Sequence, residues 1–128
     1  YRRHIGAERV QVWTDVKKKH SSHAITADVD IGETAHAVEF MRGDAVIVTG
    51  AVTGDAPQSN DVLAVKQKTH LPVYLGSGVT TANLKSFFAA ADGFIVGSEF
   101  KRGGHWAQAV DAKRVERFMA AHAKLSAE

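Results

Sequence analysis

Stretches rich in apolar and β-branched residues alternate four times along the chain with segments in which apolar residues recur at helical spacing. The first kind predicts strands at residues 9–16, 45–49, 73–75 and 93–96. The second kind predicts helices over 33–42 and 59–69, a third that Thr80 or Thr81 caps, and a fourth that Asp111 caps. The pattern therefore predicts four consecutive strand–helix units.

The apolar positions of two helices predict which side faces the core. In the helix over 33–42 these positions are Ala37, Val38 and Met41. In the last helix they are Val115, Phe118 and Met119. Side chains three or four residues apart share one face of a helix, so each set is expected to pack against the sheet.

Strands that alternate with helices indicate an α/β fold with a parallel sheet, because each helix returns the chain to the start of the next strand. The run at 45–49 is apolar throughout, which suits a strand buried on both faces. Four such units make half of a (β/α)8 barrel, which takes about 250 residues. We expect residues 1–128 to form a single half-barrel domain that is a fragment of a full barrel. The alternatives are a partner that closes the half-barrel, and a small open sheet.

Composition narrows the function classes. Apolar residues make up 45% of the 128 residues, enough for one core, and the net charge of +2 is too small and scattered to predict nucleic-acid binding. The sequence has no cysteine, which excludes disulfides, thiolate catalysis and cysteine-ligated metals. No apolar run approaches the ~18–20 residues that span a bilayer. These features favour a cytoplasmic protein.

Two glycine–serine turns follow the third and fourth predicted strands. Glycine lets a backbone approach an anion closely, and helix N-termini present N–H groups with partial positive charge. The loops after the last two strands are also the usual phosphate site of a barrel. The predicted phosphate-binding residues are Gly76, Ser77, Gly78, Gly97, Ser98 and, as a point charge, Lys101. The alternative is that the turns are merely tight and that Lys101 is a surface lysine.

Asp15 and Lys17 are the candidate catalytic residues. They lie two apart on the first strand, so both are expected to point to one side, inward at the catalytic rim of a barrel. A buried lysine can act as a base or form a Schiff base. A neighbouring aspartate opposes that role, because it favours the charged ammonium. The alternative is an ion pair that shapes the barrel mouth.

Further polar residues follow the second strand. Thr49, Gly50 and Thr53 are candidates for binding a sugar hydroxyl, with turn chemistry as the alternative. Trp106 is either a lid that stacks on a base or a packed anchor, and packing is the favoured interpretation. His20 and His23 have no third ligand at a recognisable spacing, so no metal site is predicted, and no motif predicts a cofactor.

Five blocks of sequence occur in the order found in one known family. They are residues 14–21, 48–50 with 53–54, 75–80, 95–101, and 110–111 with 114–119. Residues 15–20, which read DVKKKH, are the most specific, since glycine–serine turns occur in many phosphate-binding barrels. These blocks resemble the BtpA/SgcQ family, and the resemblance extends over nearly the whole chain.

The resemblance implies a fold and two rival functions. Family members resemble complete TIM barrels, so this chain corresponds to the C-terminal half of a (β/α)8 TIM barrel. Some members are labelled enzymes of sugar metabolism or nucleosidases, which implies a phosphate-binding segment for a phosphorylated sugar or nucleoside-type metabolite. One cyanobacterial branch is associated with photosystem I as a peripheral membrane factor, which implies a non-catalytic assembly or stability factor acting through protein partners. Whether the chain is catalytic stays open, and its expected partner is a missing N-terminal half-barrel or a second copy.

Overall fold

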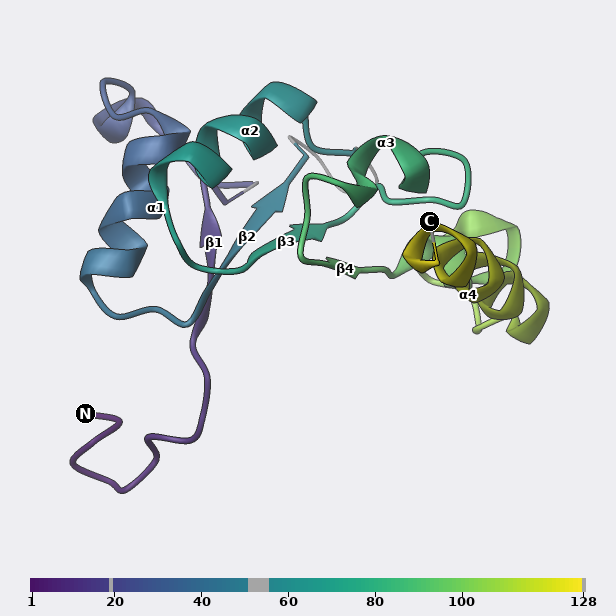
Figure 1. Ribbon diagram of the computed structural model, residues 1–128, viewed down its shortest axis with the longest axis horizontal. Helices are drawn as coiled ribbons and strands as arrows, with labels where there is room; N and C mark the ends of the chain where they lie inside the picture. The colour runs from purple at the N-terminus through teal and green to yellow at the C-terminus, as the bar shows by residue number, and fades with distance from the viewer. Residues whose placement is uncertain (19, 51–55, 128) are drawn as a thin grey trace.

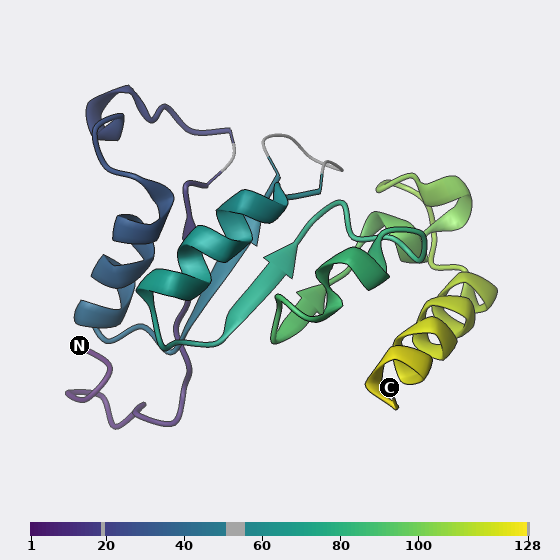
Figure 2. The ribbon, with the colours of Figure 1, turned by 45° about the horizontal axis from the view of Figure 1, so that its top comes forward.

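The computed structural model describes residues 1–18, 20–50 and 56–127 of the chain (Figure 1 and Figure 2). The four strands are β1 Trp13–Val16, β2 Ala45–Thr49, β3 Val73–Gly76 and β4 Gly93–Ile95. The α-helices are α1 Ile31–Phe40, α2 Ser59–Lys68, α3 Leu84–Phe88 and α4 Ala112–Ser126. Three short 3-10 turns are η1 Ala24–Thr26, η2 Ser98–Phe100 and η3 Arg102–Gly104.

The four strands form one parallel sheet in the order β1-β2-β3-β4. Each strand pairs with the next one along the chain, and one row of the register joins Asp15, Ile47, Tyr74 and Gly93. Consecutive neighbours in a parallel sheet require a crossover between them, and in the first three units a helix supplies it. The predicted class, four parallel βα units arranged as in half of a barrel, is thus confirmed.

One face of the sheet carries the core. Helices α1, α2 and α3 lie along this face (Figure 2). Alternate strand residues point toward them, and the valines of β2 are fully buried there. The buried core contains Val16, Val46, Val48, Val62, Val65, Val73, Leu75, Leu84 and Phe87. Burial of these side chains is the main stabilising term of the domain.

The opposite face of the sheet is uncovered in the part of the chain that the structure describes. Trp13 of β1 stacks on Tyr74 of β3, with ring centroids 4.1 Å apart. Trp13 remains 41% exposed and Ile95 of β4 remains 43% exposed. In a complete barrel, this is the face that points to the interior.

Helix α4 lies beyond β4 at one end of the sheet (Figure 1). Its cap is the predicted one, because the Asp111 carboxylate accepts a hydrogen bond from the Lys113 N–H. Phe118 is its buried residue, and its ring meets that of Phe100 edge-on at 5.3 Å between centroids. Met119 is 51% exposed, so the predicted stripe is wrong at this position.

Two further expectations about helices are wrong. Helix α1 begins at Ile31 rather than 33, since Asp30 caps it by accepting from the Glu33 N–H at 2.7 Å. Its buried side follows Ile31 and Ala35, and Met41 is 78% exposed beyond the end of the helix.

Helix α3 begins at Leu84 rather than after Thr80 or Thr81. The chain between them is a turn in which Thr80 and Asn83 exchange hydrogen bonds. The Thr80 N–H donates to Asn83 Oδ1 at 2.7 Å, and the Asn83 N–H donates to Thr80 Oγ1 at 3.3 Å. Because this turn satisfies its own polar groups, it takes the place of the first helical turn.

Candidate functional site

The carboxyl ends of the four parallel strands meet at one edge of the sheet, where ligands bind in α/β folds. Two hollows lie there. The first, which we call the glycine hollow, is formed by residues 77–80, 97–99 and 104–106 and has a volume of about 290 Å³. The second, the histidine hollow, has a volume of about 370 Å³ and is formed by residues of the β1–α1 loop, the end of β2 and the start of α2.

The glycine hollow brings both predicted glycine–serine turns together. Ser77 and Gly78 are both left-handed, with φ of 66° and 64°, and this reverses the chain directly after β3. Gly97 and Ser98 form the neighbouring wall. A Cβ atom added to Gly97 would have nothing within 4 Å, so this position opens onto free space.

Gly76 has a steric role. A Cβ atom at this position would lie 3.2 Å from the methyl groups of both Ile47 and Thr49. Glycine therefore lets the end of β3 pass closely beside β2. Gly76 is one of the predicted phosphate-binding residues, but it does not line the hollow. In this structure it shapes the end of the strand that leads into the hollow.

The helix expected directly after Thr80 or Thr81 begins at Leu84, and no α-helix of the described residues begins in the lining of the hollow. Helix α3 has only five residues, and the turn after Gly97 leads into the three-residue η2. The Thr81 N–H already donates to Glu99 Oε1 at 3.3 Å. Among the described residues, the hollow is therefore lined by two turns and by the loop that contains Trp106, without the first turn of an α-helix.

Glu99 is a wall residue that sequence reasoning missed. Its carboxylate accepts from Thr81 Oγ1 at 2.8 Å and from Arg114 Nη2 at 2.8 Å. The side chains of Arg114 and Glu99 are only 22% and 11% exposed. The arginine offsets a negative charge that would otherwise repel an anionic ligand. The two residues are fifteen apart, and no local motif signals their contact.

Lys101 does not line the glycine hollow. Its backbone instead forms an isolated antiparallel bridge with Val110, which closes the loop between them. At the tip of that loop, Trp106 lines the hollow and is 68% exposed, which overturns the favoured interpretation of a packed anchor. Its indole ring stacks with the His105 ring, 5.8 Å away between centroids.

Asp15 and Lys17 do not share a side. Lys17 has φ of 53°, so the alternation of side chains between the two faces of the strand ends there. Its ammonium donates to the Val29 carbonyl at 2.6 Å and to the Thr26 carbonyl at 3.2 Å. Lys17 lines the histidine hollow, whereas Asp15 is exposed in the row of the uncovered face. Their expected pairing at one rim is therefore wrong.

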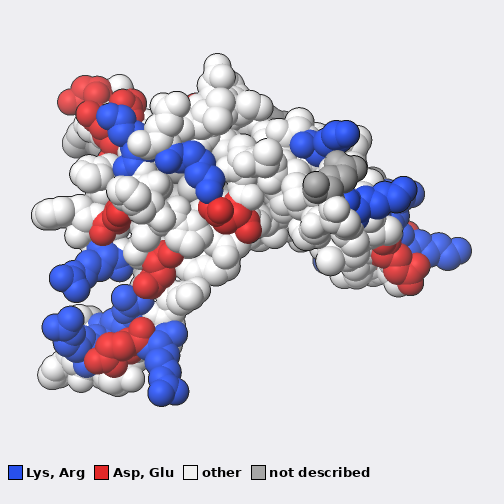
Figure 3. All heavy atoms as spheres, viewed as in Figure 1, with Lys and Arg blue, Asp and Glu red and all other residues white. Residues whose placement is uncertain are grey.

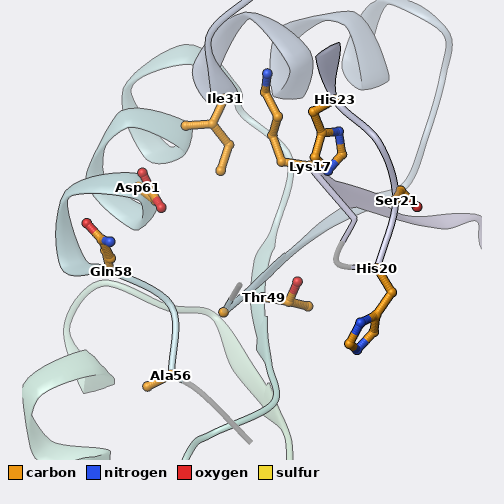
Figure 4. Close-up of a pocket in the computed structure, with 10 residues that line it drawn as sticks. Lys17, His20, Ser21, His23, Ile31, Thr49, Ala56, Gln58 and Asp61 are labelled. Atoms are coloured by element: carbon orange, nitrogen blue, oxygen red, sulfur yellow. The ribbon is translucent and has the colours of Figure 1, made fainter. Parts of the chain in front are cut away.

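The histidine hollow contains two of the predicted substrate residues, Thr49 and Gly50. Figure 4 shows Gln58 and Asp61 on the α2 side of the hollow and His23 on the opposite side, with Thr49 between them. Thr49 Oγ1 is buried and has no hydrogen-bond partner within the described part of the chain. Thr53 lies outside the described residues.

A metal ligand set is absent from the histidine hollow as far as the described residues go. His23 Nε2 lies 2.8 Å from the Lys18 carbonyl oxygen, so one ring nitrogen is engaged with the backbone. No group of three or more histidine, aspartate or glutamate side chains gathers within residues 1–18, 20–50 and 56–127.

The shifted carboxyl pKa values belong to the opposite edge of the sheet. The Thr69 hydroxyl, followed by the His70 N–H, holds the pKa of Glu39 at about 2. The Val12 N–H is the main cause of the lowered pKa of Asp44. Burial is the largest single effect on the pKa of Asp92 and raises it, but the hydrogen bonds from Lys66 and the Val73 N–H together outweigh burial, so the pKa is lowered. Each of these carboxylates connects two segments that are distant in the sequence, and none of them lines either hollow, so they serve the fold.

Positive and negative side chains lie close to one another on the face shown in Figure 3, mainly toward its left and right sides. Within the described residues, no helix combines the length and the apolar character needed to cross a membrane.

These observations define a parallel α/β half-barrel with two hollows at the carboxyl ends of its strands, each lined by both polar and apolar groups. The chain belongs to the BtpA family, which it matches over residues 1–124. It is 44% identical over 119 residues to an uncharacterized mitochondrial protein of Caenorhabditis elegans, covering 93% of this chain and 43% of that protein.

Two further relatives place the chain within longer proteins. A Pyrococcus abyssi protein is 37% identical over 109 residues, which are 85% of this chain and 41% of that protein. The photosystem I biogenesis protein BtpA of Synechocystis is 34% identical over 125 residues, which are 97% of this chain and 43% of that protein. The chain thus spans less than half the length of these curated relatives.

Proposed function

We propose that the carboxyl edge of the sheet binds a phosphorylated sugar or nucleoside-type metabolite, with its phosphate in the glycine hollow. One observation carries the proposal: turns from two adjacent parallel strands, at Ser77–Gly78 and Gly97–Ser98, line the same hollow. Turns of this kind present backbone N–H groups and hydroxyls, which are the donors that phosphate requires.

The rest of the ligand would extend into the histidine hollow. Thr49 pairs in register with Gly76, so the end of β2 lies next to the strand that leads into the glycine hollow. The buried Thr49 hydroxyl and the side chains of Gln58 and Asp61 offer donors and acceptors for sugar hydroxyls. Lys17 is the candidate catalytic group that lies in this hollow, whereas Asp15 is exposed in the row of the uncovered face.

Two variants at Gly97 test the phosphate site. Gly97→Asp adds a negative charge in the space above the turn, and Gly97→Asn adds a neutral side chain of the same shape. A phosphate about 4 Å away is repelled by ~1–4 kcal/mol, depending on local screening. We expect ribose 5-phosphate to bind at least fivefold more weakly to the aspartate variant than to the asparagine variant, by calorimetry on folded protein. Equal affinities would refute the site.

A second candidate function is that of a non-catalytic assembly or stability factor. The name of the Synechocystis relative favours it. For the uncovered face of the sheet, which includes Trp13, Tyr74 and Ile95, we propose that a second set of four βα units covers it. The longer relatives have enough residues to supply such a set within one chain. When this chain is present by itself, a second copy of it would supply the set. A stable protein complex without small-molecule affinity would favour this function over the first.

A further inference from the structure

We propose that the ligand of the glycine hollow is a nucleoside 5′-phosphate whose base stacks on Trp106. The inference rests on the proposed phosphate site and names the class of the ligand. Trp106 and the glycine–serine turns line the same hollow, so a ligand held by its phosphate at Gly97 and Ser98 has an indole within the same space.

The exposure of Trp106 is unusual for its residue type. Tryptophan is highly buried on average, yet this indole is 68% exposed and faces a hollow. The His105 ring stacks on the indole, with the two ring planes 24° apart and their centroids 5.8 Å apart, and Trp106 keeps its high exposure in spite of this contact. A flat aromatic surface at the edge of a polar hollow suits a planar base better than a sugar.

The loop that carries Trp106 is fixed at both ends. The Arg102 N–H donates to the Ala109 carbonyl at 2.9 Å, and the Asp111 N–H donates to the Phe100 carbonyl at 2.8 Å. Together with the bridge between Lys101 and Val110, these bonds close the loop at its base.

The tip of the loop is also tied. The Ala107 N–H donates to His105 Nδ1 at 3.3 Å, and the Gln108 N–H donates to the His105 carbonyl at 3.0 Å. A loop that is ordered before binding loses little conformational freedom when the ligand arrives. Trp106 is thus held as a preformed stacking surface.

The electrostatics of the hollow agree with a phosphate at one end and a neutral ring at the other. The carboxylate of Glu99 is the acidic group among the residues that line it, and Arg114 pairs with this carboxylate. His105 and Trp106 form the aromatic end of the hollow. Their rings contact the base, and neither side chain is negatively charged.

The test compares adenosine 5′-monophosphate with ribose 5-phosphate in calorimetric titrations of the whole chain. We expect the nucleotide to bind about 5- to 150-fold more tightly, the range that the stacking of one base provides. Trp106→Ala should remove this advantage and leave the ribose 5-phosphate affinity within twofold. Trp106→Phe, which keeps an aromatic face, should retain most of the advantage.

Phe40→Ala is the matched control, because Phe40 is 82% exposed on α1 and does not line the hollow. This variant should change neither affinity. If ribose 5-phosphate binds and the nucleotide binds no better, or if Trp106→Ala weakens both ligands equally, the stacking inference is wrong and the phosphate site stands. If neither ligand binds to folded protein, the phosphate site and the inference both fail.

Discussion

Arg114 of α4 binds Glu99 through two groups: its Nε donates to the backbone carbonyl at 2.6 Å, and its Nη2 donates to the carboxylate at 2.8 Å. The same carboxylate accepts from the Thr81 hydroxyl. One acidic side chain therefore joins the turn after β3, the turn after β4 and the last helix. Since these two turns form the glycine hollow, the position of α4 is coupled to the shape of the proposed phosphate site.

Removal of the arginine should lower both the stability of the fold and the affinity of the glycine hollow for phosphate. Arg114→Gln leaves the Glu99 carboxylate without its cation, so we expect a loss of about 1–3 kcal/mol in the free energy of unfolding by urea. The uncompensated charge should also weaken phosphate binding. In the double variant Arg114→Gln/Glu99→Gln the charge is gone, and phosphate affinity should recover toward that of the original chain. A single variant as stable as the parent would contradict this role.

Gly93 should not tolerate a side chain while Tyr74 keeps its present position. A Cβ atom on Gly93 would lie 2.5 Å from Tyr74 Cε1, and Tyr74 stacks on Trp13. We expect Gly93→Ala to displace the tyrosine ring and cost about 1–3 kcal/mol. The near-ultraviolet circular dichroism of the stacked rings should weaken as well.

The control for this prediction is a double-mutant cycle. In a Tyr74→Ala background the ring that causes the clash is absent, so Gly93→Ala should cost far less there. An equal cost in both backgrounds would show that the glycine is needed for its backbone instead.

Acid should weaken the contact between α1 and the segment before β3. The hydrogen bond from Thr69, followed by that from the His70 N–H, lowers the pKa of Glu39 from 4.5 to about 2. Because the folded-state pKa is depressed, the stabilisation is complete above about 4.5 and is lost as the pH falls toward 2. The difference in melting temperature between the parent and Glu39→Gln should therefore shrink over this range.

Glu116→Gln is the control for that measurement, since it removes the same charge from an exposed position on α4. Its melting temperature should follow that of the parent across the titration. A difference for Glu39→Gln that stays constant from pH 6 to pH 2 would show that the stabilisation does not depend on the ionised carboxylate.

The sequence predicts the elements whose signals are local. The strand at Ala45–Thr49 matches its continuous apolar run residue for residue, and the cap of α4 is the predicted Asp111. Both depend on neighbouring residues alone, namely a run of apolar and β-branched residues in one case and a short polar side chain before a helix in the other.

The details of the site escape such reasoning because they depend on long-range contacts. The direction of Lys17 follows from a left-handed backbone and from carbonyl groups nine and twelve residues away. The exposure of Trp106 follows from the closure of its loop by Lys101 and Val110. Periodicity describes faces of elements, and it carries no information on where a loop folds back.

The uncovered face of the sheet should make the isolated chain associate with itself. Trp13 and Ile95 remain 41% and 43% exposed on this face, and β1 and β4 each have a single neighbour in the described sheet. Exposed apolar faces and unpaired strand edges drive association. Sedimentation equilibrium should therefore reveal a dimer in which Ile95→Lys weakens association at least tenfold. Met41→Lys, at a more exposed site after α1, should leave association unchanged. A parent chain that stays monomeric at high concentration would show that this face does not bind a second copy.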